Sequence, residues 1–229
     1  MLLAEDLLLL LTNDDTGRLA KSGSEVDVAL GGALLVDLAL MGRVDVAGPS
    51  EPVREGRLVV RDSTPTGDAV LDEALVTIGE REGKKPQGVV TRLGKGVRAK
   101  LYGRLAEGGL VRAEEGRVLG IFPIERWPAE DANHETSVRA GIASALREGR
   151  TSDPRTGALI ALLLALRAVD KVMDASSVGL SKKDLRASAK RIAEGDWAAK
   201  AVRQAIDSTN AAITVVITSG AVAAGGGGS

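Results

Sequence analysis

The stretch Ser24–Met41, SEVDVALGGALLVDLALM, carries a strong helical signal in this chain. Its apolar residues recur at Val26, Leu30, Leu34 and Leu38, the spacing of one helix face, and Gly42 favours a helix end. Working outward, the nearly all-apolar run Leu2–Leu11 predicts a shorter helix that is buried on every side. The first part of the chain is therefore expected to supply core helices.

The remaining segments favour further helices and two strand pairs. The expected helices are 69–81, 96–107, one long helix from the Asp153-Pro154 cap through Met173, a Ser181-capped helix toward Gly195, and 197–217. The expected strand pairs are Val44–Val46 with Arg57–Arg61, and Leu110–Arg112 with Val118–Phe122 around a Glu114-Glu115-Gly116 turn. The sequence predicts a mainly α fold, a helical bundle core with surrounding amphipathic helices and two small β-hairpins. We expect a single domain over 1–224 and a flexible Gly/Ser tail at 225–229.

Composition argues against most kinds of chemistry. The 229 residues include no Cys and a single His, so neither a Cys-ligated zinc site nor a multi-histidine metal site is expected. No phosphate-loop or nucleophile-elbow motif occurs. We interpret His134 as an exposed loop residue and Asp37 as a capping or paired structural carboxylate. The prediction is a protein that is not an enzyme and uses no cofactor or metal.

The apolar segments are too short for a membrane span. The longest uninterrupted apolar run, Ala158–Leu166, is well below the ~20 residues that a spanning helix needs. Glu5 and Asp6 lie where an export signal would carry positive charge. A cytoplasmic location is therefore expected.

Basic residues are concentrated in Arg81–Arg104 although the formal net charge of the chain is −1. On an ideal helix from Gly96 to Glu107, Lys95 and Arg98 fall on the same border of the apolar face. Two cations at a helix start, beside the backbone N–H groups of Gly94 and Gly96, could hold a phosphate. The alternative interpretation is a solvated basic face without a ligand.

A second functional hypothesis comes from the order of elements in Gly96–Phe122. A helix followed by two strands is typical of the end of a winged helix, which would make the chain a DNA or protein interaction module. The outer face of the expected recognition helix offers Ala99, Tyr102 and Gly103 rather than base-reading side chains. With aromatic residues at 2% of the chain, nucleic acid is an unlikely partner.

Several stretches resemble the Golgi phosphoprotein 3 family in its short bacterial-type form. They are Leu3–Leu10, Leu30–Arg43, Thr64–Leu75 with its Pro-Thr-Gly-Asp and Leu-Asp-Glu-Ala motifs, and Asp153-Pro-Arg before an apolar helix. The richness in Arg, Ala, Gly and Val also suggests a bacterial gene. The resemblance implies a mainly helical, peripheral membrane protein that binds phosphatidylinositol 4-phosphate in a basic pocket. In eukaryotic members it also implies an adaptor that holds glycosyltransferases in the Golgi.

The resemblance also implies roles for individual residues. Two cations that bind the lipid phosphate correspond to Lys95 and Arg98, while a further Arg and a Trp of the family fall on Gly31 and near Ser22. A membrane-inserting or oligomer-forming hairpin corresponds to the segment with Ile121, Phe122 and Ile124, whose alternative role is packing on its own core. The expected partners are an anionic phospholipid, a second copy through the hairpin, and an unknown protein client, at the cytosolic face of a membrane.

Overall fold

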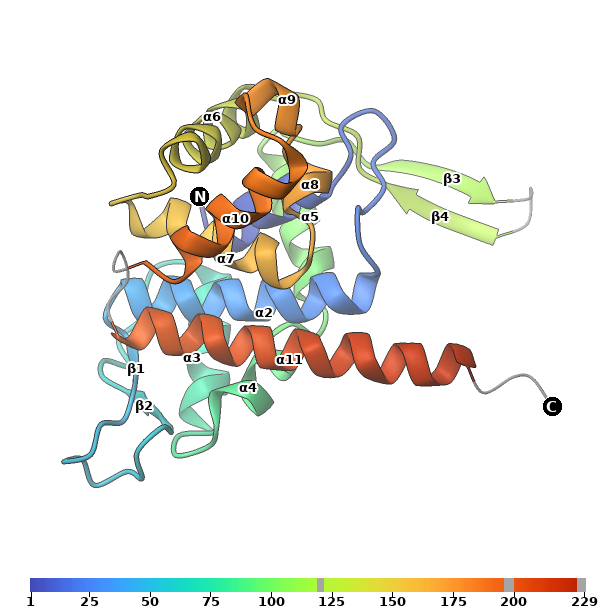
Figure 1. Ribbon diagram of the computed structural model, residues 1–229. Coiled ribbons are helices and arrows are strands. Elements are labelled where there is room, and N and C mark those ends of the chain that lie inside the picture. Colours follow the sequence, from blue (N-terminus) through green and yellow to red (C-terminus); the bar gives the residue numbers. More distant parts are fainter. Residues whose placement is uncertain (119–121, 196–199, 226–229) are drawn as a thin grey trace.

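The computed structural model describes residues 1–118, 122–195 and 200–225, and most of them are helical (Figure 1). The helices are α1 (Leu3–Leu11), α2 (Gly23–Leu40), α3 (Ala69–Gly79), α4 (Pro86–Leu93), α5 (Val97–Glu107), α6 (Asn133–Glu148), α7 (Pro154–Ala165), α8 (Val169–Val172), α9 (Ala175–Val178), α10 (Lys182–Ala193) and α11 (Lys200–Gly225). Two antiparallel strand pairs accompany them, β1 (Val44–Val46) with β2 (Leu58–Val60) and β3 (Glu114–Val118) with β4 (Phe122–Arg126). The predicted mainly α fold with two small hairpins is confirmed.

Helix α2 is the centre of the fold, and α1, α4, α7 and α11 all pack against it. Two glycines of α2 allow close approaches. A Cβ atom at Gly31 would lie 2.2 Å from the carbonyl oxygen of Val90 in α4, and one at Gly32 would lie 2.2 Å from the Thr209 side chain in α11. Helix α11 lies alongside α2 and runs in the opposite direction (Figure 1). Glycines in α2 thus let the backbone of α4 and a side chain of α11 pack directly against the α2 backbone.

Helix α1 is buried along its whole length, as its apolar composition predicts. Its two acidic residues, Glu5 and Asp6, are also buried, at 4% and 5% exposure. Carboxylates at this depth require partners, and the structure supplies Arg104 for Glu5 and Arg155 for Asp6. The two buried carboxylates of α1 are thus each paired with an arginine from another helix.

The prediction of one continuous helix from Pro154 to Met173 is wrong. Helix α7 ends at Ala165, and Arg167 adopts a left-handed conformation with φ of 50°. The N–H of Ala168 donates to the Leu163 carbonyl and the N–H of Arg167 to that of Leu164, as in a Schellman motif. Glycine normally holds this position, so the apolar periodicity continued past the helix end without a visible stop.

The second hairpin is displaced from its predicted position. Its strands pair Glu114 with Arg126 and Val118 with Phe122, so Glu114-Glu115-Gly116 lies within a strand and does not form the turn. A turn was expected here because these three residues separate the segments Leu110–Arg112 and Val118–Phe122. The two strands pair over five residues each, and beyond the pair of Glu114 and Arg126 an isolated bridge joins Val111 to Ala129. Leu110–Arg112 is therefore not a strand of the pair.

Three further differences concern helices. The sequence pattern did not indicate α4, which begins at Pro86, or α6. Helix α11 was expected to end at Ile217 and instead continues to Gly225. Within the described residues, no helix combines the length and the apolar character that crossing a bilayer requires.

Candidate anion-binding site

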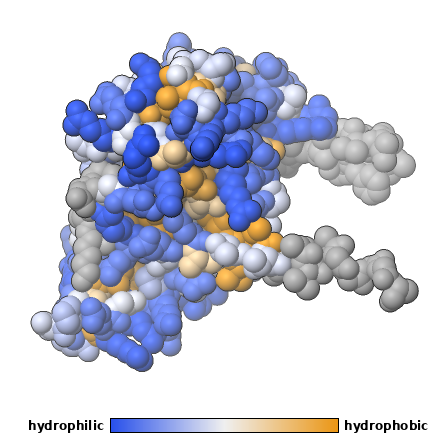
Figure 2. All heavy atoms as spheres, viewed as in Figure 1, coloured by the Kyte–Doolittle hydropathy of each residue, from blue (hydrophilic) through white to orange (hydrophobic). Residues whose placement is uncertain are grey.

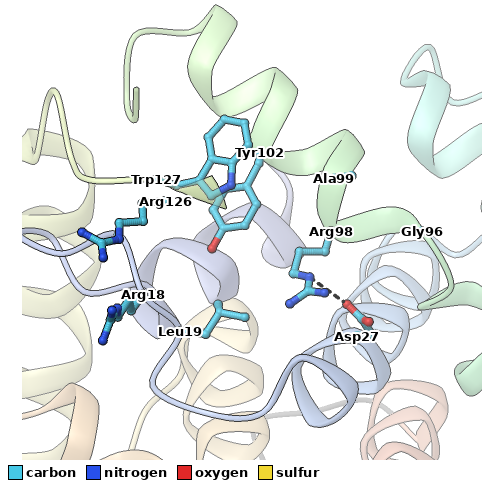
Figure 3. Close-up of a pocket in the computed structure, with 10 residues that line it drawn as sticks. Arg18, Leu19, Asp27, Gly96, Arg98, Ala99, Tyr102, Arg126 and Trp127 are labelled. Carbon is cyan, nitrogen blue, oxygen red and sulfur yellow. Dashed lines mark ion pairs between the residues drawn. The ribbon is translucent and has the colours of Figure 1, made fainter. Parts of the chain in front are cut away.

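A pocket of about 660 Å³ lies where the turn after α1 meets α2, α5 and the end of β4. Its charged lining residues are Arg18, Asp27, Arg98 and Arg126, and we call it the arginine pocket. Figure 3 shows Arg18 and Arg126 on one side and Arg98 on the other, where it points toward Asp27. Three guanidinium groups from distant parts of the chain thus border one cavity.

The three arginines differ in their partners. Arg98 Nε lies 3.1 Å from Asp27 Oδ1, and the two side chains are 33% and 32% exposed, so water and ligands can reach this ion pair. Arg18 and Arg126 form no ion pair within the described part of the chain. The Nε atom of Arg126 is buried and has no hydrogen-bond partner there. The pocket therefore presents guanidinium donors that the described residues do not use.

An aromatic pair forms one wall of the pocket. The rings of Tyr102 and Trp127 stack with centroids 4.7 Å apart and an interplanar angle of 4°. The Thr12 hydroxyl donates to the Leu8 carbonyl, so the Tyr102 hydroxyl is the donor in its 2.8 Å bond to Thr12. Burial raises the pKa of Tyr102, against the opposing effect of the Thr12 bond. The wall is therefore rigid and uncharged.

Close backbone approaches fix the pocket's position. Gly17, with φ of 60°, lies so near the chain after β4 that an added Cβ would be 2.2 Å from the Trp127 nitrogen. At Gly23, the first residue of α2, a Cβ would lie 2.7 Å from Arg98 Nη1. The pocket is thus located beside the N-terminal end of α2.

Lys95 does not line the arginine pocket. It borders a separate shallow hollow with Arg92 and Lys100. The predicted common border with Arg98 assumed a helix that includes Lys95, whereas α5 begins at Val97 after Gly96 in a left-handed conformation with φ of 77°. Lys95 is exposed, and its binding of a lipid phosphate stays a prediction.

The backbone expected to support this phosphate is only partly available. Gly94 is buried, and a Cβ there would lie 1.9 Å from the Asp27 carbonyl oxygen. Its N–H already donates to the Val90 carbonyl. Gly94 therefore serves helix packing, and the expectation of an exposed N–H at this residue is wrong.

Two positions that the resemblance singled out have other roles. Ser22 caps α2, where its hydroxyl accepts from the Glu25 N–H and bonds the Glu25 carboxylate. Gly31 faces the α4 backbone with no space for a Cβ. An arginine introduced at Gly31 would therefore disrupt the packing of α2 on α4 and could not extend the pocket.

The hairpin residues expected to contact a membrane or a second copy are described only in part. Ile121 lies outside the described residues. The backbones of Phe122 and Ile124 belong to β4, and the placement of their side chains is outside the description as well. Their contact role stays a prediction.

A second group of charges surrounds α1, and we call it the N-terminal charge cluster: Asp6, Asp37, His134 and Arg155. Arg155 Nη2 lies 2.8 Å from Asp6 Oδ2, and its Nη1 lies 3.3 Å from Asp37 Oδ1. His134 Nε2 is 2.8 Å from Asp6 Oδ1. His134 starts α6, so the expectation of an exposed loop residue is wrong, while the interpretation of Asp37 as a paired structural carboxylate is confirmed.

Asp37 has a perturbed acidity within this cluster. Burial raises the pKa of its carboxyl to about 6, and the nearby Arg155 and the Leu3 N–H only partly offset that effect. The carboxylate also accepts a 2.8 Å hydrogen bond from the Leu3 N–H, so it connects α2 to the start of α1. No group of three or more His, Asp or Glu side chains in the described ranges is placed to hold a metal ion.

Sequence reasoning found Arg98 and missed Arg18, Arg126, Tyr102 and Trp127. These residues come from a turn, a strand end and a helix, which no local pattern connects. The sequence did offer one signal for the aromatic wall. The chain has a single Tyr and only two Trp, so each of these residues could have been singled out as a candidate site residue.

Comparisons with known proteins agree with the resemblance seen in the sequence. A family model described as Golgi phosphoprotein 3 (GPP34) matches residues 3–209. The vacuolar protein sorting-associated protein 74 of Eremothecium gossypii is 28% identical over 164 residues, which cover 63% of this chain and 48% of that protein. The chain thus spans about half the length of this curated relative. Because the family match extends from α1 into α11 and includes every residue of the arginine pocket, the chain belongs to the Golgi phosphoprotein 3 family.

Proposed function

We propose that this chain is a non-enzymatic, peripheral membrane protein that binds the phosphorylated head group of an anionic lipid in the arginine pocket. Phosphatidylinositol 4-phosphate is the first candidate lipid, by family membership. The observation that carries the proposal is the convergence of Arg18, Arg98 and Arg126 beside an uncharged aromatic wall. An adaptor role toward a protein client, still unidentified, follows from the same family.

The chemistry of the pocket suits a phosphate group. Guanidinium groups bind phosphate oxygens through paired hydrogen bonds, and Arg18 and Arg126 have no competing carboxylate within the described chain. Arg98 is held by Asp27 and would be shared between Asp27 and the ligand.

The aromatic wall supports recognition of the rest of the head group. The ring of an inositol can pack against an aromatic side chain while its hydroxyls reach polar groups at the pocket edge. The Tyr102–Trp127 stack supplies such a surface within the same cavity as the arginines. This combination favours a phosphorylated ring over a simple serine head group.

Lys95 and the hairpin would act beside the pocket. Lys95 is exposed near the start of α5 and would add attraction toward an anionic surface. Residues Ile121, Phe122 and Ile124 would enter the membrane or contact a second copy. Replacing Phe122 with Ser is expected to lower lipid binding of a dilute monomer in the first case and to dissociate oligomers in the second.

The winged-helix alternative receives less support. Helices α4 and α5 followed by β3 and β4 do reproduce its order of elements. However, two cations of α5 are paired with carboxylates, Lys100 with Glu73 and Arg104 with Glu5 and Asp68, and Arg98 faces the arginine pocket. A recognition helix needs free donors on its outer face.

Vesicle sedimentation tests the proposal. The full chain is mixed with phosphatidylcholine vesicles that contain phosphatidylinositol 4-phosphate, phosphatidylserine or no anionic lipid. The double variant Arg18→Ala, Arg126→Ala should bind the phosphoinositide vesicles about tenfold or more weakly, because each guanidinium contributes on the order of 1 kcal/mol.

A matched control removes the same charge elsewhere. Arg147 and Arg150 are exposed at the end of α6 and have no ion pair within the described chain. The double variant Arg147→Ala, Arg150→Ala should bind like the wild type. Equal binding by wild type and the pocket variant on every vesicle would overturn the proposal.

A further inference from the structure

The C-terminal part of α11 carries no charge. No Asp, Glu, Lys or Arg follows Asp207, although 27% of the whole chain is charged. The segment 210–225 also lies beyond the residues that the family model matches. We call 210–225 the uncharged end of α11, and it requires an explanation that the family match does not provide.

This uncharged end projects from the body of the protein. Gly32 of α2 contacts Thr209 of α11, and the two helices run in opposite directions. Because α2 begins at Gly23, α11 becomes level with that end near residue 218 and continues to Gly225. The overhang is therefore about 10 Å long at the rise of an α-helix, and Figure 1 shows it leaving the molecule.

The overhang and the arginine pocket are on the same side of the molecule. The Arg98 guanidinium lies against Gly23, the residue that starts α2, and α11 passes this end of α2 as it leaves the body. The β3–β4 pair projects in the same direction (Figure 1). A flat surface bound at the pocket would thus face the overhang.

The described side chains of this end are suited to an apolar environment. Val215 is 54% exposed, one of few large hydrophobic side chains so exposed in the described chain. The exposed Thr214 and Thr218 hydroxyls donate within the helix, at 2.8 Å to the Asn210 carbonyl and at 2.9 Å to the Thr214 carbonyl. These hydroxyl donors are hydrogen-bonded without water, which reduces the free-energy cost of moving this part of α11 from water into an apolar environment.

Figure 2 shows hydrophobic residues gathered where α11 leaves the body. Val216 and Ile217 of α11 are partly buried and pack against the core. The apolar surface is thus continuous from the core edge to the exposed Val215.

We propose that the uncharged end of α11 inserts into the interfacial layer of the lipid surface whose head groups the arginine pocket binds. This inference rests on the proposed function. Charge complementarity favours a lipid surface over a second copy, because cations for anionic head groups lie beside a charge-free helix end. The overhang of about 10 Å also matches the ~5–10 Å depth of the interfacial layer. The pocket would supply head-group selection, and the helix end would supply apolar anchoring.

The first experiment removes the apolar contact without touching the pocket. Val215→Asp in the full chain should weaken binding to vesicles with phosphatidylinositol 4-phosphate about fivefold or more, because an apolar contact is replaced by a charge. The matched control is Val76→Asp in α3, where a valine is 64% exposed away from this end. The control should bind like the wild type, and equal binding by both variants would overturn the inference.

The second experiment reads insertion directly and does not depend on the Asp variant. Because the chain has no Cys, Val215→Cys and Val76→Cys can each carry one environment-sensitive fluorophore. On vesicle binding, the label at position 215 should shift to the blue and be quenched by lipids with spin labels in the acyl chains. The label at position 76 should do neither.

The outcomes separate this inference from the proposed function. Vesicle binding without a change at position 215 would overturn the insertion of α11 and leave the pocket proposal standing. A blue shift that depends on protein concentration and needs no vesicles would show a second copy as the occupant and would also overturn the inference. Absence of vesicle binding would overturn both.

Discussion

The arginine pocket and the N-terminal charge cluster use the same residue type in opposite ways. Arg155, itself 40% exposed, contacts Asp6, Asp37 and the Met1 carbonyl, and both carboxylate side chains are only 6% exposed. Arg18 and Arg126 have no such partners in the described chain, and Arg98 shares only a half-exposed Asp27. Charges that are satisfied within the protein hold its helices together, whereas charges left without partners remain available to a ligand.

The largest expected effect comes from removing the cation of the N-terminal charge cluster. Arg155→Met would leave Asp6 and Asp37 buried without their shared partner. We expect the free energy of unfolding to fall by about 3 kcal/mol, because two carboxylates that are each 6% exposed lose the guanidinium between them, which is itself 40% exposed. Urea denaturation followed by circular dichroism measures this change, and a loss below about 1 kcal/mol would contradict the structural role of the cluster.

The second prediction uses the pKa of Asp37, which burial raises from its ordinary value near 3.8 to about 6. A raised carboxyl pKa means that the folded state binds the proton more tightly than the unfolded state. The stabilisation is therefore present below pH 4 and is lost as the pH rises through 6. Asn at this position can still accept a hydrogen bond from the Leu3 N–H. As the pH rises from 4 to 7, the free energy of unfolding of Asp37→Asn should therefore increase by up to about 3 kcal/mol relative to that of the wild type.

The control for this pH dependence is Asp174→Asn. The pKa of Asp174 is lowered by hydrogen bonds that its carboxylate accepts. The Ser176 side chain has the largest effect, followed by the backbone N–H groups of Ser176 and Ser177. The stability difference between this variant and wild type should therefore change with pH in the opposite direction. If the difference in unfolding free energy between Asp37→Asn and wild type did not change from pH 4 to 7, the raised pKa of Asp37 would be refuted.

Much of the fold could be predicted from the sequence because it depends on local signals. Asp153 followed by Pro154, and Ser181 three residues before Asp184, cap helices that the structure confirms. The apolar periodicity of α2 correctly predicted a core helix. These signals act within one or two helical turns, where neighbours along the chain are neighbours in space.

The remaining features depend on contacts between distant segments. Arg167 ends α7 in a conformation that glycine usually adopts, so no residue type marked the stop. Lys95 appeared next to Arg98 on an ideal helix, and the left-handed Gly96 between them breaks that geometry. The pocket itself exists because the Gly17 turn packs on the chain at Trp127, a contact that no pattern in either segment announces.

The third prediction converts a paired pocket arginine into an unpaired one. Asp27→Asn removes the carboxylate 3.1 Å from Arg98 and so leaves the guanidinium available to a ligand. Binding to vesicles with phosphatidylinositol 4-phosphate should tighten about threefold, which corresponds to roughly 0.6 kcal/mol. Asp62→Asn, which removes the carboxylate paired with Arg43 just beyond the C-terminal end of α2, makes the same change in net charge away from the pocket.

The two variants distinguish a local from a general effect of charge. If the arginine pocket binds the head group, Asp27→Asn should tighten binding more than Asp62→Asn at moderate salt, where screening leaves only close contacts effective. Equal gains would show that attraction to the vesicle depends on net charge alone. In that case Arg98 would not contact the lipid.

The smallest expected effect is on stability at the pocket. Arg18 is exposed and has no ion pair within the described residues, so Arg18→Ala removes no contact on which the fold depends. The free energy of unfolding should change by less than about 0.5 kcal/mol, as for most surface substitutions. Urea denaturation of this variant beside Arg155→Met gives the comparison directly. A loss for Arg18→Ala as large as that for Arg155→Met would mean that the pocket arginines stabilise the fold as the cluster does, and their lack of partners would then say nothing about a ligand.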